Sequence, residues 1–132
     1  MNKPKFRAWD KVKQKMYNVA NIDFVLEYIE IWIKSDKNNC NIEATTRDFS
    51  EVIFMQYTGL KDKNGVEIFE GDVLNYGDYK KSHEVIFKKG CFWGHAIGQK
   101  EQIGIGLFNA LEDLEVIGNI HENLELLNEV EK

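Results

Sequence analysis

Closely spaced turn signals between short apolar runs are the feature of this 132-residue chain that most constrains its fold. The second half contains three of them, at Asn64-Gly65, Glu70-Gly71-Asp72 and Lys88-Lys89-Gly90. The Asn-Gly pair is the strongest short hairpin signal, because both residues tolerate the positive φ of a tight primed turn. Short strands divided by turns about every 8–12 residues are typical of small barrels and meanders. The sequence therefore predicts an α+β or mostly β fold.

Alternating and β-branched segments between the turns supply the predicted strands. Near the start, Lys5–Asp10 alternates apolar and charged residues, and Met16–Val19 returns as its partner after a turn at Asp10-Lys11. Further strands are predicted at residues 52–58, 66–69, 73–76, 84–87, 91–96 and 115–120. Short helices are predicted at residues 107–114 and 124–130.

Residues 22–34 fit two different structures. Six apolar residues fall at helical spacing behind Asn21 in the N-cap position: Ile22, Val25, Leu26, Ile29, Trp32 and Ile33. The stretch Tyr28–Lys34 also alternates as a strand does, and its β-branched residues favour a strand in the second half of the segment. A polar loop is expected at residues 36–41.

Composition favours a soluble cytoplasmic chain. The formal net charge is −5, and the two cysteines, Cys40 and Cys91, do not form a disulfide framework, which fits a reducing compartment. No secretory signal opens the sequence. The most apolar stretch, Ile22–Ile33, contains three acidic residues and is too short to span a bilayer.

Charge is unevenly distributed between the two ends. Residues 1–15 hold six basic residues against Asp10, whereas residues 112–132 hold seven acidic residues against Lys132. Two solvated faces explain this pattern, and contact between the ends within one chain or between subunits is the alternative.

Three segments together resemble the YopX family of phage-encoded proteins. They are Lys5–Asp10, Met55–Gly65 continuing through Glu70–Val73, and Glu115–Ile120. The resemblance extends from residue 5 to about residue 127 and covers residues 22–50 loosely. It implies a phage or prophage product with one domain over residues 1–132. That domain would have a β-rich N-terminal lobe (1–50) and a small SH3-type barrel (51–132) with a short C-terminal helix. It implies no activity, because the family has no assigned biochemical role.

The residues of these segments have a structural interpretation of their own. Gly59, Gly65 and Gly71 fall where the backbone must turn tightly, and Asp62 and Asp72 can accept backbone N–H groups there. The structural motif comprises Trp9, Tyr57, Gly59, Asn64, Gly65, Gly71 and Asp72. A shared core is predicted from Phe6, Trp9, Tyr57, Ile68, Phe69 and Val73.

Catalytic and ligand-binding patterns are weak. Cys91 and His95 have the spacing of half a zinc site, but no second Cys/His pair completes it. Nothing marks Cys91 as an activated nucleophile. Gly104-Ile105-Gly106 lacks the third glycine of a dinucleotide loop, which leaves a flexible loop or a close backbone approach. The neighbouring acidic pairs, Glu112/Asp113 and Glu67/Glu70, fit solvated faces. We therefore predict no enzyme activity, no cofactor and no metal.

Two functional hypotheses remain. The preferred one is a non-enzymatic accessory protein that oligomerises with itself as an interaction module, or binds a host or phage protein, and does not bind membranes. The alternative is a DNA- or RNA-binding small barrel that uses Lys80, Lys81, Lys88, Lys89 and Trp93, since basic groups beside aromatic platforms bind single strands. The negative net charge argues against the alternative.

Overall fold

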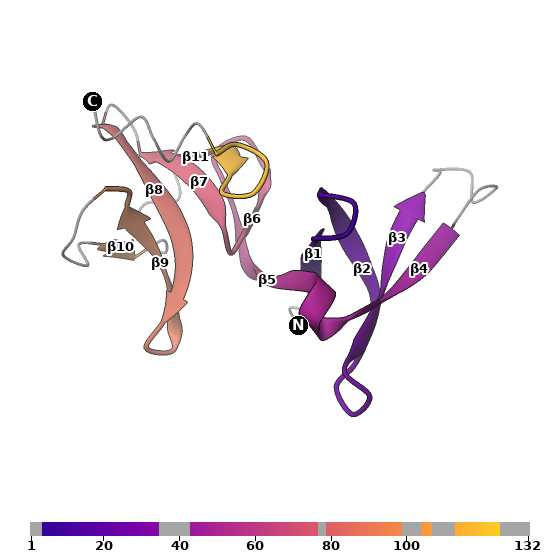
Figure 1. The fold of residues 1–132 in the computed structure, drawn as a ribbon. Coiled ribbons are helices and arrows are strands. Elements are labelled where there is room, and N and C mark those ends of the chain that lie inside the picture. The colour runs from indigo at the N-terminus through magenta and orange to yellow at the C-terminus, as the bar shows by residue number, and fades with distance from the viewer. Residues whose placement is uncertain (1–3, 35–42, 77–78, 99–103, 107–112, 125–132) are drawn as a thin grey trace. The chain divides into compact units, whose positions relative to one another are not determined.

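The computed structural model describes residues 4–34, 43–76, 79–98, 104–106 and 113–124. These residues form eleven strands and one short 3-10 helix, η1 (Figure 1). The prediction of a mostly β fold is confirmed. No helix in the described part of the chain is long and apolar enough to cross a membrane. The chain divides into two compact units, residues 3–56 and 57–132, and the division lies within the strand β5.

The first unit is an antiparallel sheet in the order β4-β3-β2-β1-β5. Its elements are β1 (Phe6–Asp10), β2 (Lys15–Asp23), β3 (Tyr28–Lys34), β4 (Glu43–Asp48), η1 (Phe49–Glu51) and the first half of β5 (Val52–Lys61). The predicted first hairpin is confirmed, with Arg7 opposite Asn18 and Trp9 opposite Met16. The helix η1 connects β4 to β5, and β5 returns beside β1.

Residues 22–34 comprise the end of β2, a turn and β3, so the strand prediction for their second half is confirmed and the helical alternative is wrong. Ile29 and Ile31 are fully buried on one face of β3, which pairs with β2 on one side and β4 on the other. Val25 and Leu26, which completed the helical spacing, lie in the exposed turn between β2 and β3.

The core of the first unit is built from residues of β1, β3 and β5. Its buried residues are Ala8, Ile29, Ile31 and Val52, with Tyr17, Val19, Ile22, Phe49 and Phe54 packed against them. Phe49 meets Phe54 edge-on at a ring-centroid distance of 4.8 Å. Since Phe49 lies in η1, the connection from β4 to β5 contributes to the core.

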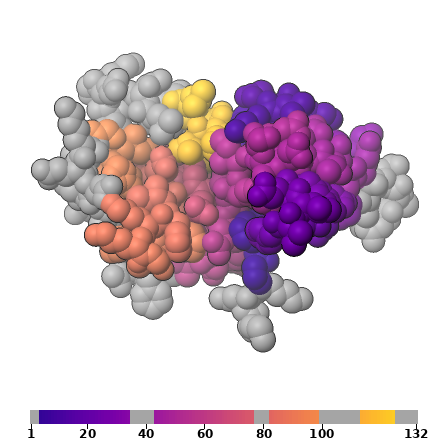
Figure 2. Space-filling view, turned by 60° about the horizontal axis from the view of Figure 1, so that its bottom comes forward, coloured from indigo at the N-terminus to yellow at the C-terminus, as the bar shows by residue number. Residues whose placement is uncertain are grey.

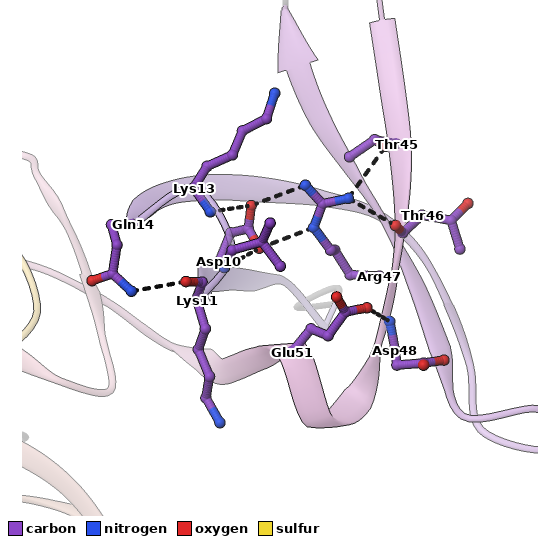
Figure 3. Close-up of polar contacts among 10 residues, drawn as sticks. Asp10, Lys11, Lys13, Gln14, Thr45, Thr46, Arg47, Asp48 and Glu51 are labelled. Carbon is purple, nitrogen blue, oxygen red and sulfur yellow. Dashed lines mark hydrogen bonds and ion pairs between the residues drawn. The ribbon is translucent and has the colours of Figure 1, made fainter.

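A buried ion pair joins β4 to the end of β1 (Figure 3). The Nε–H of Arg47 donates to Oδ1 of Asp10 at 3.0 Å, and an Nη2–H of Arg47 donates to Oδ2 at 3.3 Å. The backbone N–H groups of Val12 and Lys13 donate to the same carboxylate at 3.1 and 3.3 Å. Asp10 is fully buried, so its charge depends on these four donors. The pair connects two strands that are not neighbours in the sheet.

The second unit contains the second half of β5 and a five-stranded antiparallel sheet in the order β10-β9-β8-β7-β11. Its further elements are β6 (Glu67–Phe69), β7 (Asp72–Tyr76), β8 (Tyr79–Lys88), β9 (Cys91–Ala96), β10 (Gly104–Gly106) and β11 (Leu114–Asn119). Its core is built from Ile68, Leu74, Val85 and Leu114. Of the residues predicted for the shared core, Trp9, Ile68, Phe69 and Val73 are buried, and each unit has its own cluster of buried residues.

The strands predicted in the second half are present, with shifted ends. Leu114, expected to end a helix, begins β11, and the rest of the predicted helices, 107–112 and 125–130, lies outside the described residues. The predicted loop at 36–41 and Cys40 also lie outside them. The SH3-type barrel predicted for residues 51–132 is not closed in the described strands, since no ladder between them joins β10 to β11.

The turn predicted at residues 61–65 is present between β5 and β6, but the tight primed geometry expected for Asn64-Gly65 is wrong. Lys61 pairs with Glu67, so five residues form the loop, and only Gly65 of the pair has a positive φ, at 82°. The Asp62 carboxylate holds this loop instead, as described below. A two-residue turn with positive φ at both positions occurs at Lys89 (51°) and Gly90 (80°), between β8 and β9.

The buried ion pair leads to a prediction about stability. Arg47→Ala leaves the buried carboxylate of Asp10 with two backbone donors, and we expect the free energy of unfolding to fall by about 2–4 kcal/mol. Lys63→Ala is the control, because the Lys63–Glu115 pair is 3.8 Å long and nearly half exposed. Its removal should cost at most about 1 kcal/mol. Urea titrations measure both changes, and equal losses would contradict the proposed role of Asp10.

Candidate partner-binding surface

Three consecutive large apolar side chains are exposed in the turn between β2 and β3. The exposed fractions are 72% for Phe24, 90% for Val25 and 69% for Leu26. Figure 1 shows this turn extending beyond the ends of its strands, and Figure 2 shows it uncovered on one face of the first unit. Hairpin turns are usually built from Gly, Asn, Asp and Ser, so a continuous apolar tip indicates a contact surface.

The tip is held in one conformation by its own polar groups. Oδ1 of Asp23 accepts the N–H groups of Val25 at 2.9 Å and Leu26 at 2.8 Å. Glu27 closes the turn with a φ of 56°, and its carbonyl accepts the N–H of Phe49 at 3.1 Å. A non-glycine residue in this region carries a conformational cost that the surrounding hydrogen bonds must offset.

An aromatic stack supports the tip from below. The Phe24 ring lies edge-on to Phe49 at a centroid distance of 6.1 Å, and Phe49 in turn meets Phe54 of β5. The apolar tip is therefore continuous with the core of the first unit. A partner that contacts Phe24 contacts a side chain whose position is already defined.

The turn between β1 and β2 is basic, whereas the β2–β3 turn is bracketed by the acidic residues Asp23 and Glu27. Lys11, Lys13 and Lys15 are exposed around Val12, which is itself 56% exposed. The Asp10 carboxylate holds the backbone of this turn, and Gln14 closes it with a φ of 57°.

Both turns are bonded to the short helix η1. The N–H of Lys11 donates to the carbonyl of Glu51 at 2.9 Å, and Nζ of Lys11 donates to the carbonyl of Ser50 at 3.2 Å. The β2–β3 turn is bonded to Phe49, the other end of the same helix. An acidic turn with an apolar tip and a basic turn therefore flank one three-residue element.

The structure does not bring the four predicted lysines into one patch. Lys80 and Lys81 lie near the beginning of β8, whereas Lys88 ends that strand and Lys89 lies in the following turn. Seven residues of strand separate Lys81 from Lys88, which corresponds to roughly 23 Å. Each pair of lysines therefore belongs to a different end of the sheet.

Trp93 is bound to the hairpin that contains it. Its Nε1 donates to the carbonyl of Lys88 at 3.1 Å, and its side chain is half-buried. The aromatic ring that this hairpin exposes is Phe87, which is 52% exposed and lies edge-on to Phe92 at 5.0 Å.

The possible zinc half-site is not assembled. Cys91 and His95 lie four residues apart on β9, so their backbones are separated by roughly 13 Å. His95 lies opposite Glu84 of β8, where burial raises the pKa of the Glu84 carboxyl and the charge of His95 opposes that increase. In the part of the chain that the structure describes, no three His, Cys, Asp or Glu side chains are grouped to hold a metal ion. Gly104–Gly106 forms the strand β10, so the flexible-loop alternative is wrong, and the close backbone approach stays a prediction.

The motif residues make contacts within their own units. Trp9 is buried, and the Tyr57 ring lies 5.4 Å from that of Phe69. Gly59 has a φ of 84° where the β5–β6 pairing is interrupted, and Gly71 has a φ of 82° in the turn before β7. Asp72 is buried and accepts the N–H of Phe69 at 2.8 Å.

Asp62 connects the five-residue loop to β11. Its Oδ1 accepts the N–H groups of Asn64 at 2.8 Å and Val66 at 2.9 Å, and its Oδ2 accepts that of Val116 at 2.9 Å. Burial raises the pKa of Asp62, but these three donors and the charge of Lys63 outweigh it and lower the pKa below 3.8.

The sequence interpretation missed the apolar tip. Helical spacing assigned Val25 and Leu26 to a buried face. The available signal was the segment Asp23–Glu27, in which acidic residues bracket three apolar ones between two alternating stretches. An Asp that begins such a bracket is typical of a turn in which the side chain binds the backbone two residues later.

Comparisons with known proteins identify relatives of this chain. A family model described as YopX protein matches residues 5–128. The crystal structure of protein EF1440 from Enterococcus faecalis is similar, with 36% sequence identity and a TM-score of 0.64. That similarity covers 96% of this chain and 99% of that chain. No curated protein matches.

The contacts of Asp62 predict a dependence of stability on pH. Because its folded pKa is lowered, its contribution is fully present above the ordinary value of 3.8 and is lost as the pH falls through the folded pKa. Asp62→Asn should cost about 1–3 kcal/mol at neutral pH, since one backbone donor loses its acceptor. It should also reduce the loss of stability in acid. Asp113→Asn, which removes an exposed carboxylate, is the control. Urea titrations at pH 3 and 7 measure the free energy of unfolding of both variants. Equal changes in the two variants would contradict the prediction.

Proposed function

We propose that this chain, which belongs to the YopX family over residues 5–128, is a non-enzymatic phage or prophage accessory protein that oligomerises through the β2–β3 turn. The observation that carries the proposal is the exposure of Phe24, Val25 and Leu26 in a turn held by hydrogen bonds. Exposed apolar side chains on a rigid support are suited to protein contacts, because little conformational freedom is lost when they bind.

The size of the tip supports a role as an anchor of the interface. Full burial of one large apolar side chain contributes about 1.5–3 kcal/mol. A few such side chains at the centre of an interface usually dominate its binding energy. Three neighbouring residues that are each more than two-thirds exposed can therefore supply the central part of a stable contact.

The charges around the tip favour a protein partner over a phosphate-bearing one. Residues 23–30 contain Asp23, Glu27 and Glu30 and no basic residue. A nucleic-acid backbone or an anionic membrane surface would be repelled there, whereas a protein surface with basic groups around an apolar centre would be attracted.

Nucleic-acid binding is the alternative proposal, and it would use the β8–β9 hairpin. The exposed Phe87 ring and Lys89 favour it, since stacking and charge bind single strands together. The charge of the second unit argues against it, because residues 57–132 contain eight Lys and no Arg against fourteen Asp and Glu.

The SH3-type barrel predicted for residues 51–132 remains a proposal, and the connections of the first unit also resemble those of such a barrel, although no ladder joins β4 to β5 in the described strands. There β1 pairs with both β2 and β5, and η1 connects β4 to β5. Small barrels of this type carry many unrelated functions, so the fold positions the tip without assigning its activity.

The proposal predicts the mass of the protein in solution. Light scattering after size-exclusion chromatography should give a multiple of 15.4 kDa for the wild type. The double variant Val25→Asn/Leu26→Asn should dissociate at least about tenfold more readily, because it removes anchor side chains. Val66→Asn/Leu124→Asn is the matched control, since it replaces the same residue types at exposed positions of the second unit.

Two outcomes would contradict the proposal. A wild-type mass of 15.4 kDa at the highest soluble concentration would exclude self-association. Equal dissociation of the two double variants would show that the tip is not the contact. A shift of a wild-type monomer on addition of a mixed DNA and RNA pool, reversed by salt, would favour nucleic-acid binding instead.

A further inference from the structure

We propose that the surface that receives the β2–β3 turn is the basic β1–β2 turn of a second copy of this chain, so that two copies associate about a two-fold axis beside η1. This inference rests on the proposed function and names the partner surface of the same site. It requires three properties of the two turns, namely opposite charge, a common support in η1 and accessibility.

The two turns have opposite charges and similar construction. Residues 11–15 contain three lysines and no acidic residue, and residues 23–30 contain three acidic residues and no basic one. Each has exposed apolar side chains at its centre, Val12 in the first and Phe24, Val25 and Leu26 in the second. An apolar centre within a charged rim is the usual construction of a protein interface.

The helix η1 is bonded to both turns, which lie at opposite ends of the nine-residue strand β2. The β1–β2 turn is bonded to Ser50 and Glu51, and the β2–β3 turn is bonded to Phe49. A 3-10 helix rises about 2 Å per residue, so these attachment points are roughly 4–6 Å apart along its axis. Figure 3 shows the side chains of Lys11 and Lys13 extending in opposite directions from the β1–β2 turn.

Symmetry makes this arrangement self-complementary. In a two-fold dimer the same patch on both copies forms the interface, so a residue and its contact each occur twice. A two-fold axis beside η1 places the acidic turn of each copy against the basic turn of the other. Both attractive contacts then form together, and neither turn of either copy is left to bind a further copy.

The charged groups remain available for a second copy. Lys13, Lys15 and Glu27 are exposed, whereas the groups that hold the turns together are Asp10 and Asp23. The backbone conformation of each turn is therefore maintained by one carboxylate while the neighbouring charges face solvent. Rim charges of this kind mainly set the orientation and the rate of association, and the apolar centre supplies most of the affinity.

A charge-swap experiment tests the inference on the full-length chain. One variant carries Lys13→Glu/Lys15→Glu, and the other carries Glu27→Lys/Glu30→Lys. Alone, each variant opposes like charges, and we expect its dimer dissociation constant to rise at least about tenfold. When the two are mixed in equal amounts, every acidic turn faces a basic one, and the heterodimer should recover an affinity within about threefold of the wild type.

Controls separate this contact from general effects of charge and folding. Lys61→Glu/Lys89→Glu makes the same change in net charge as Lys13→Glu/Lys15→Glu, at exposed positions of the second unit, and should leave the dimer intact. Urea midpoints of all variants should agree with that of the wild type. Raising the salt concentration should slow the association of the wild type, because exposed charges are screened.

The outcomes distinguish failure of the inference from failure of the proposed function. A wild-type dimer that survives both charge reversals places the receiving surface elsewhere and overturns the inference while the proposed function stands. Swapped variants that remain monomeric when mixed, or a wild-type assembly larger than a dimer, overturn the reciprocal two-fold contact. A wild-type monomer overturns both proposals.

Discussion

The buried carboxylate of Asp10 is the interaction on which the first unit depends. It receives two bonds from Arg47 of β4 and two from the backbone of the following turn, so one group fixes a turn and joins two strands that the sheet does not pair. A buried charge is tolerated only when its bonding capacity is satisfied. The position of η1 follows, since it must connect the end of β4 to a β5 that lies beside β1.

Aspartates organise the loops of both units in the same way. Asp23 holds the β2–β3 turn, Asp62 joins the β5–β6 loop to β11, and Asp72 receives the N–H of Phe69 in the turn before β7. Each carboxylate replaces backbone bonds that a loop cannot make with itself. In the β2–β3 turn these bonds use backbone N–H groups, so the side chains of the same residues are not needed to hold the turn, and Val25 and Leu26 are exposed.

Local patterns in the sequence were sufficient for the strands but not for their connections. The first hairpin and β3 could be predicted because alternation and β-branching are properties of neighbouring residues. The Asp10–Arg47 pair spans 37 positions, and no local pattern specifies such a contact. The Asn64-Gly65 loop was assigned the wrong geometry because Val116, 54 positions beyond Asp62, helps to determine it. The apolar tip was missed because spacing cannot separate a helix from a turn between two strands.

The arrangement of the two turns links association to folding. Asp10 forms the ion pair between β1 and β4 and also binds the backbone of the basic turn. Phe49 belongs to the core and also packs against Phe24 of the apolar tip. The surface formed by these turns therefore exists only when the first unit is folded. Association would stabilise that unit by mass action, because the unfolded chain presents neither turn in a defined position. In a small sheet with one satisfied buried charge, the same contacts thus supply stability and would define the proposed binding surface.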